Sequence, residues 1–253
     1  MARAPRFSVS STTAYETCPR RYRFGYLDRV KVDRGLAPQH WRFGSVVHAG
    51  LEAAYKRHRE AGTDDRLDHA VPVALEAVRA SWVSEAMPDD PAELTRAETI
   101  VADDLAATRL APRDILGVEH WFTTKTDDGL TVGGAADLVV RADRTTVEIR
   151  DHKVTTHTRS AEQLAGDFQL GVYGWFALRT WPWAERVVVA HHYPITRELV
   201  RIPLDDAWIG RSMERLQGVA HLTLADADFA PVPGDHCSNC VYIDLCDAAV
   251  RPS

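Results

Sequence analysis

The 253-residue sequence predicts an α/β fold in one large domain, and three observations support this prediction. Apolar residues follow helical spacing up to about residue 110. From Asp114 the pattern changes to the alternation that is typical of strands. A helix, two further strands and a closing helix then follow. The expected order is therefore helices, a three-strand meander, a helix, two strands and a helix.

The composition is that of an ordinary soluble globular protein, with 45% hydrophobic and 26% charged residues. No apolar run approaches the ~20 residues that cross a bilayer, and the first residues contain no apolar core of a secretion signal. We therefore expect a cytoplasmic protein without a membrane partner. The formal net charge of −6 does not indicate nucleic-acid binding, although an acidic metal site can mask a local basic groove.

The first segment is expected to form a short helix that Ser10 or Ser11 caps and that ends where Pro19 follows Cys18. Arg20 and Arg21 come next, interleaved with aromatic residues. A basic and aromatic cluster suits phosphates and stacked bases. The same pattern also fits a half-buried helix whose aromatics pack and whose arginines face water.

Three further helices are predicted before the strands begin. The first runs from Gly44 to about Arg59, and His48 lies on its first turns as either a packed residue or a ligand. The other two span residues 65–86 and 90–110, separated by a proline-containing breaker. Their acidic, amphipathic sequences require no chemistry, so we interpret them as a helical insert that covers one side of the site.

Three consecutive strands are predicted over residues 114–125, 130–141 and 145–155. Glu119 on the first strand fits either a position in a site or an ion pair with an arginine. The second strand carries Asp137. The third ends in Asp151-His152-Lys153, where alternation places Asp151 and Lys153 on one face and His152 on the other. Two carboxylates and a lysine can hold a divalent cation beside an activated water, but an ordinary solvated hairpin has the same local pattern.

The remaining chain is predicted to continue with a helix over 161–180, strands over 187–195 and 198–204, and a helix over 205–224. Gln169 and Tyr173 stand at i and i+4, so they share one helical face. A solvent-facing position for Gln169 fits the sequence equally well.

Four cysteines are present: Cys18 near the start and a C-x2-C-x5-C pattern formed by Cys237, Cys240 and Cys246. In a chain without a secretion signal, this spacing favours metal or cluster ligation over disulfides. Three ligands need a fourth, which Cys18 alone can supply. Buried structural thiols are the alternative interpretation.

The order of these motifs resembles that of the PD-(D/E)XK nucleases of the RecB-like branch: G-S-x-x-H at His48, then Asp137, then Asp151-x-Lys153, then Gln169-x3-Tyr173. The cysteine pattern resembles the sub-branch with an iron–sulfur cluster, which includes the AddB-type recombination nucleases and the CRISPR-associated adaptation nucleases. Two departures are the sequence Ala-Ala-Asp at the first acidic motif, in place of a proline-containing form, and the histidine between Asp151 and Lys153. Neither departure removes a reacting group.

The resemblance implies a restriction-endonuclease-like core, in which a mixed central sheet is flanked by helices. It implies a single nuclease domain over residues 1–253, with the helical insert at about 62–110 and the core at about 111–225. A C-terminal cysteine segment, 226–253, is expected to be joined to Cys18 by a [4Fe–4S] cluster, with Zn²⁺ as the alternative occupant. Such a group would close a very long loop and hold a loop-rich terminus.

The resemblance also assigns roles to individual residues. His48, Asp137 and Asp151 match metal ligands, with the backbone carbonyl of His152 as a further ligand. Hard carboxylate oxygens suit Mg²⁺ or Mn²⁺, which polarises a phosphate and activates water. Lys153 matches the residue that orients or deprotonates the attacking water, and both roles remain open.

Gln169 and Tyr173 match a motif that positions DNA and supports the active site, and Arg20 and Arg21 are candidate DNA contacts. The expected activity is metal-dependent hydrolysis of DNA, as an exonuclease on single strands or DNA ends in recombination and repair, alongside a helicase or another recombination protein. A CRISPR-associated spacer-processing nuclease shares every motif and is the first alternative. A non-catalytic, metal-stapled DNA-binding module is the second.

Overall fold

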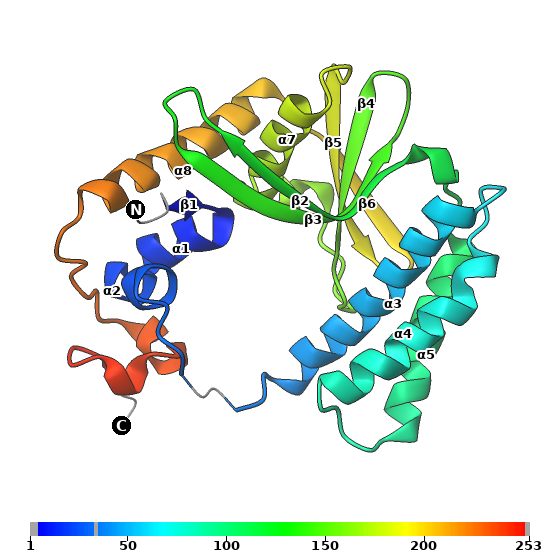
Figure 1. The fold of residues 1–253 in the computed structure, drawn as a ribbon, viewed down its shortest axis with the longest axis horizontal. Coiled ribbons are helices and arrows are strands. Elements are labelled where there is room, and N and C mark those ends of the chain that lie inside the picture. Colours follow the sequence, from blue (N-terminus) through cyan, green and yellow to red (C-terminus); the bar gives the residue numbers. More distant parts are fainter. Residues whose placement is uncertain (1–4, 33–34, 251–253) are drawn as a thin grey trace. The chain divides into compact units, whose positions relative to one another are not determined.

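The computed structural model describes residues 5–32 and 35–250 (Figure 1). The chain divides into two compact units, which are described separately. The first comprises Met1–Gly35, Phe122–Gly134 and Ala207–Ser253, and the second comprises Leu36–Trp121 and Ala135–Asp206. The expected single domain and its internal boundaries stay predictions. In the described ranges, every helix is too short or too polar to span a membrane.

A mixed sheet of six strands runs through the described chain, in the order β1-β3-β4-β5-β6 with β2 beside β3. β3 with β4 and β5 with β6 pair antiparallel, whereas β4 with β5 and β1 with β3 pair parallel. The strands are β1 (Arg6–Phe7), β2 (Ile115–Lys125), β3 (Thr131–Arg141), β4 (Thr146–His152), β5 (Arg186–Tyr193) and β6 (Glu198–Pro203). The predicted fold class, a mixed sheet flanked by helices, is confirmed.

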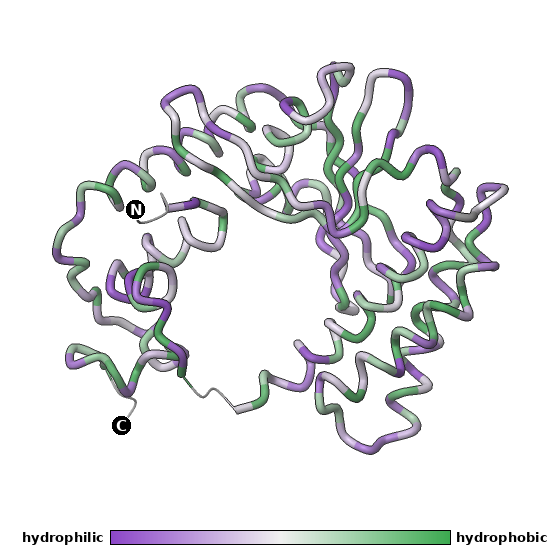
Figure 2. Tube along the Cα trace, viewed as in Figure 1, coloured by the Kyte–Doolittle hydropathy of each residue, from purple (hydrophilic) through white to green (hydrophobic). Residues whose placement is uncertain are grey.

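Helices cover both faces of the sheet in the second unit. α3 (Gln39–Ala61), α4 (Val71–Ser84) and α5 (Pro91–Ala107) share one hydrophobic core with Leu138 and Val140 of β3. Hydrophobic residues recur along all three of these helices (Figure 2). α7 (Phe168–Thr180) packs on β4 and β5. Because the central strands are enclosed from both sides, every residue of β4 is buried.

The helix predicted from Gly44 to about Arg59 is α3, which buries an apolar face. Its members are at most 1% exposed: Val46, Val47, Leu51, Ala54 and Tyr55. The helix extends beyond the predicted segment at both ends, to Gln39 and Ala61. Gly50 lets α4 approach closely, since a Cβ at this position would lie 2.7 Å from Cγ2 of Val78.

The two insert helices form where the sequence predicts them, with shorter ends. Asp90 caps α5 by accepting hydrogen bonds from the backbone N–H groups of Ala92 and Glu93. Pro91 occupies the first helical position, where its missing N–H costs nothing.

The prediction of one continuous helix over 161–180 is wrong. The structure has a short helix, α6 (Ala161–Leu164), and then α7 (Phe168–Thr180). Gly166 between them adopts φ +82°, a left-handed conformation that interrupts a helix. Asp167 then caps α7 by accepting from the backbone N–H groups of Gln169 and Leu170.

In the first unit, the N-terminal helix is capped one turn earlier than expected. α1 (Val9–Thr17) has Ser8 as its cap, in place of Ser10 or Ser11. Ser8 and Ser11 form a reciprocal capping box, so Ser11 takes part from inside the helix. α2 (Pro19–Tyr22) and a π-helical turn (Arg23–Leu27) follow.

Contacts between distant segments hold the first unit together. Tyr15 donates a 2.7 Å hydrogen bond to Asp226, just after α8 (Asp206–Ala225). The ring of Tyr22 stacks between Tyr26 and Phe229, with centroids 5.2 and 6.1 Å away. Tyr22, which is 1% exposed, therefore serves as a packing group, whereas Tyr26 is 40% exposed. The C-terminal segment contains only short 3₁₀ turns, Asp235–Asn239 and Ile243–Leu245.

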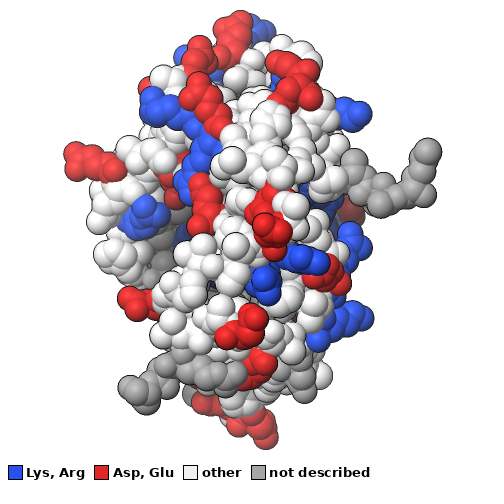
Figure 3. All heavy atoms as spheres, turned by 90° about the vertical axis from the view of Figure 1, so that its left-hand side faces the viewer, with Lys and Arg blue, Asp and Glu red and all other residues white. Residues whose placement is uncertain are grey.

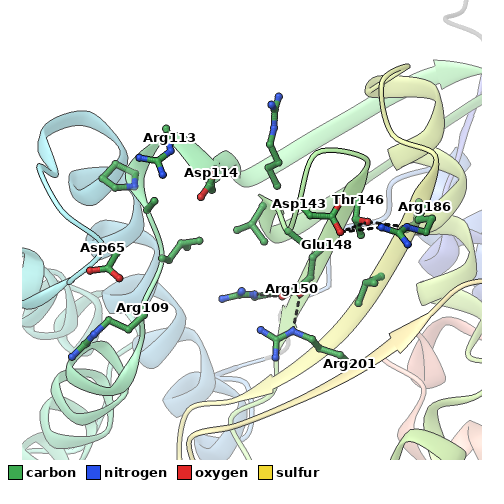
Figure 4. Close-up of a pocket in the computed structure, with 18 of the residues that line it drawn as sticks. Asp65, Arg109, Arg113, Asp114, Asp143, Thr146, Glu148, Arg150, Arg186 and Arg201 are labelled. Atoms are coloured by element: carbon green, nitrogen blue, oxygen red, sulfur yellow. Dashed lines mark hydrogen bonds and ion pairs between the residues drawn. The ribbon is translucent and has the colours of Figure 1, made fainter.

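A buried ion-pair network lines a cavity of about 960 Å³ in the second unit (Figure 4). Glu148 is 3% exposed and accepts from Nε of Arg150 at 2.5 Å and from Nε of Arg201 at 2.8 Å. Burial raises the pKa of Glu148, but the two guanidinium groups outweigh this effect and hold its pKa below the ordinary value. This stabilisation is present above the ordinary glutamate pKa and is lost as the pH falls through the lower folded-state value.

We expect Glu148→Ala to lower the free energy of unfolding by about 3–5 kcal/mol at neutral pH, because Arg150 would be left buried without a counter-charge. Chemical denaturation measures this loss. Asp103→Ala is the matched control, since the Asp103–Arg197 pair is more than half exposed on both sides and should contribute at most about 1 kcal/mol. Equal losses in the two variants would contradict the assigned importance of burial.

Candidate metal and active site

The second unit brings the predicted acidic hairpin and His48 together. In the antiparallel register Leu138 pairs with Arg150, which places Asp137, midway along β3, opposite Asp151 at the C-terminal end of β4. His48, on α3, points its Nδ1 to within 3.8 Å of Oδ2 of Asp137. Residues far apart in the sequence therefore meet at one edge of the sheet.

The backbone of His152 contacts both Asp137 and His48. Its N–H donates a 2.7 Å hydrogen bond to Oδ2 of Asp137, and its carbonyl oxygen lies 3.1 Å from Nε2 of His48. The position predicted for a backbone ligand is thus next to two of the predicted side-chain ligands. The lone pair of the His152 carbonyl oxygen, which faces Nε2 of His48, could serve a cation equally well.

From the sequence, Glu119 fits either a position in a site or an ion pair with an arginine. In the structure it lies with the site residues. Ligand atoms of His48, Glu119 and Asp137 lie within 4.8 Å of one another, a grouping that could hold a metal ion. Glu119 has φ +47°, and the adjacent residues Gly117 and Val118 are both buried, so the alternation of β2 is interrupted here. This irregularity turns the carboxylate toward the site and hides it from pattern reasoning.

Asp151 has a different set of neighbours from this trio. Its Oδ2 lies 2.5 Å from Nζ of Lys153, and its Oδ1 accepts from Nε2 of Gln169 at 3.2 Å. Gln169 in turn donates to the hydroxyl of Tyr173 at 2.7 Å, and Tyr173 donates to the carbonyl of Ala135 at 2.6 Å. The predicted i, i+4 pair therefore forms one hydrogen-bonded path from α7 to Asp151 and β3.

Negative charge accumulates at this edge of the sheet. Burial raises the pKa of Asp137, and the Asp151 carboxylate raises it further. Burial also raises the pKa of Glu119, with added repulsion from Asp137. Burial lowers the pKa of Lys153, but the Asp151 carboxylate outweighs burial, so this pKa lies above its ordinary value. Three carboxylates against one ammonium leave a net charge of about −2, which fits a divalent cation.

The site opens into a cleft of about 690 Å³. His48, Glu119, Asp137 and Lys153 line it together with Trp41 of α3. Trp41 is 66% exposed, so a large indole ring faces solvent at the cleft. This aromatic contact was not singled out from the sequence, because exposure cannot be read from a single aromatic residue.

The four cysteines lie together in the first unit. All line one small pocket: Cys18, Cys237, Cys240 and Cys246. None of them forms a disulfide. In the described part of the chain, no three Cys, His or acidic ligand atoms in this pocket lie within 4.8 Å of one another.

Arg20 and Arg21 line the same pocket. Nε of Arg20 donates to the carbonyl of Phe229 at 3.1 Å, and Nη1 lies 3.9 Å from Asp247. These contacts give Arg20 a structural use in holding the C-terminal segment. A DNA contact by either arginine stays a prediction.

The sequence and the fold have known counterparts. A family model described as the PD-(D/E)XK nuclease superfamily matches residues 6–247. Among solved structures, the "Putative exonuclease" of Eubacterium rectale is 12% identical, with 98% of this chain and 91% of that chain covered and a TM-score of 0.57. This likeness shows a shared fold. SSO0001 is 14% identical over 99% and 89% of the two chains, with a TM-score of 0.39 that carries no argument. No curated protein matches the chain.

We expect Mn²⁺ or Mg²⁺ to raise the melting temperature at about pH 7.5, because a cation at ~100 times its Kd adds about 2.7 kcal/mol. The increase should shrink toward pH 5, since protons compete for Asp137 and Glu119, whose pKa values are raised. These raised values also mean that the metal-free protein gains stability from both groups as the pH falls. Scanning calorimetry with and without cation measures both effects.

Asp137→Asn is the control for this experiment. The carboxamide oxygen can still accept the hydrogen bond of the His152 N–H, but one of the negative charges is removed. The cation-dependent rise in melting temperature should therefore disappear, without loss of stability in the metal-free protein. A rise of unchanged size in this variant would contradict a cation at Asp137.

Proposed function

Since the chain belongs to the PD-(D/E)XK nuclease superfamily, we propose that it is a Mg²⁺- or Mn²⁺-dependent deoxyribonuclease that hydrolyses phosphodiester bonds. The observation that carries this proposal is the convergence of His48, Glu119 and Asp137 beside the Asp151–Lys153 pair. The restriction-endonuclease-like fold holds these groups at one edge of the mixed sheet.

The donor set fits a hard divalent cation. His48, Glu119, Asp137 and the carbonyl of His152 supply one imidazole nitrogen and otherwise oxygen ligands, which Mg²⁺ and Mn²⁺ accept. Asp151 is the fifth candidate ligand. A bound divalent cation supplies Lewis acidity toward a phosphoryl oxygen and lowers the pKa of water.

Lys153 acts on the substrate side of Asp151. Its pKa is raised, so the ammonium form prevails and can donate hydrogen bonds to an attacking water or to a non-bridging phosphate oxygen. A developing negative charge in the transition state strengthens these bonds. Gln169 and Tyr173 hold the Asp151 carboxylate that faces Lys153.

The cleft supports a single-stranded substrate or a DNA end. The exposed ring of Trp41 offers a face on which an unpaired base can stack, a contact worth about 1–3 kcal/mol. On the face shown in Figure 3, basic and acidic side chains are interspersed. We therefore propose exonuclease action, in recombination and repair with a helicase or another recombination protein as partner.

Lys153→Ala should lower the rate of Mg²⁺-dependent cleavage of single-stranded DNA by about 10²- to 10⁴-fold, because it removes the donor at the reacting phosphate. DNA binding measured in Ca²⁺ should change by only a few fold. The assay is digestion of DNA labelled separately at each end, which also reports the polarity of cleavage.

Lys31→Ala is the matched control for Lys153→Ala. Lys31 is an exposed residue of the first unit. Its removal should leave cleavage unchanged. Undiminished cleavage by Lys153→Ala would refute the assigned role, and DNA binding without cleavage by the unaltered protein would favour a non-catalytic binding module.

We also propose that the cysteine pocket holds a [4Fe–4S] cluster with a structural role, which places the chain in the iron–sulfur sub-branch of the RecB-like nucleases. Four thiolates line one pocket of the first unit, as such a cluster requires. The resemblance of the cysteine spacing to that of the iron–sulfur sub-branch favours a cluster over a single Zn²⁺.

Protein purified without oxygen should be brown, with charge-transfer absorption at roughly 400 nm. Cys246→Ser should lose this absorption and unfold at lower temperature, because the C-terminal segment would be released. Iron, sulfide and zinc analysis of the same sample provides the control. A colourless protein with one zinc ion per chain would overturn the cluster proposal and leave the nuclease proposal untouched.

A further inference from the structure

The imidazole of His152 begins a buried chain of hydrogen bonds that leads away from the cation site. Its Nδ1 lies 2.8 Å from Nδ1 of His192 on β5. Nε2 of His192 lies 2.8 Å from Oδ1 of Asp104 on α5. All three side chains are at least nine-tenths buried, with residue exposures of 5%, 6% and 1%.

The chemistry of the three groups determines the direction of these bonds. A carboxylate can only accept, so Nε2–H of His192 donates to Asp104. In neutral His192 the other ring nitrogen, Nδ1, is then an acceptor. His152 therefore carries its proton on Nδ1 and donates it to His192. This assignment is that of the uncharged His192 ring, and it gives each ring one tautomer.

The ring plane of His152 is set by a further contact. Tyr55 of α3 stacks on it with centroids 5.8 Å apart and planes 11° from parallel. Tyr55 is 1% exposed and belongs to the core of the helical layer. A hydrogen bond within the ring plane and a stacked ring above it leave the imidazole a single orientation.

The same residue carries the peptide that faces the cation site. Its N–H holds Asp137 and its carbonyl oxygen lies beside His48. The ring anchors the Cα of His152 from one side, and the peptide unit of that carbonyl is held from the other, because the Lys153 N–H donates a 2.7 Å hydrogen bond to the carbonyl oxygen of His192. We propose that Asp104 and His192 are positioning residues that orient the His152 peptide for a divalent cation. The proposal deepens the proposed function and rests on it.

Packing alone does not account for this chain of hydrogen bonds between His152, His192 and Asp104. An apolar trio of similar size would fill the space without the cost of burying a carboxylate. The second oxygen of Asp104, Oδ2, is buried and has no hydrogen-bond partner among the described residues. Such a group destabilises the core, and a positional role at the site explains why it lies there.

The test is Mn²⁺ binding to the full chain without DNA, measured by electron paramagnetic resonance of the free ion. Asp104→Ala and His192→Phe should weaken Mn²⁺ binding by about 10- to 100-fold, the usual effect of losing a group that orients a ligand. Asp104→Asn should bind Mn²⁺ with intermediate strength, because its amide oxygen can still accept from His192. Calorimetry on each variant reports whether it is folded.

Asp103→Ala is the matched control, since Asp103 is the preceding residue of α5 and its side chain is 57% exposed. It should bind Mn²⁺ like the unaltered protein. The ¹⁵N and ¹H resonances of the two histidine rings provide a second readout. The Nδ1–H signal of His152 should be present in the unaltered protein and in Asp103→Ala, and lost or shifted in Asp104→Asn and His192→Phe.

Folded Asp104→Ala with Mn²⁺ affinity within twofold of the unaltered protein would overturn the proposal. If Asp104→Ala does not fold, Asp104→Asn decides: a shifted ring signal with unchanged Mn²⁺ affinity would overturn it equally. Failure of the unaltered protein to bind Mn²⁺ would instead contradict the cation site and the proposed function that depends on it. The two failures are therefore distinguishable.

Discussion

Repulsion among buried carboxylates is the constraint on which the rest of this structure depends. Glu119, Asp137 and Asp151 come together at one edge of the sheet, where Lys153 pairs with Asp151 and His48 lies 3.8 Å from Asp137. The pKa values of Glu119 and Asp137 are raised because burial and mutual repulsion disfavour their charges. A rigid frame of paired strands has to hold these groups in place until a cation neutralises them.

That frame is a central strand whose two faces have separate tasks. Alternation along β4 directs Asp151 toward α7, where Gln169 binds it. The same alternation directs Glu148, Arg150 and His152 to the opposite face. Each of these three polar residues has a charged or hydrogen-bonding partner there, as the burial of the whole strand requires. Chemistry at one end of the strand is thus accompanied by polar contacts of its buried residues on the opposite face.

Much of the candidate site follows from local patterns in the sequence, whereas its irregular parts do not. Asp137 and Asp151 are on strands that alternation identifies, and the antiparallel register then places them side by side. Glu119 could not be assigned, because a positive φ interrupts the alternation at that residue. The break of the helix at Gly166 was also missed, since glycine in a helical pattern marks an end only when its φ is known.

The sequence by itself determined the strands of the sheet apart from β1, the shared face of Asp151 and Lys153, and the order of motifs that identifies the family. These features depend on spacings of a few residues, which strand and helix geometry set. Only the tertiary structure decided that Asp104, in an insert without apparent chemistry, meets His192 across 88 positions of the chain. No periodicity connects two such residues, because their contact results from the tertiary arrangement of the helical layer and the sheet and from the need of each buried polar group for a partner.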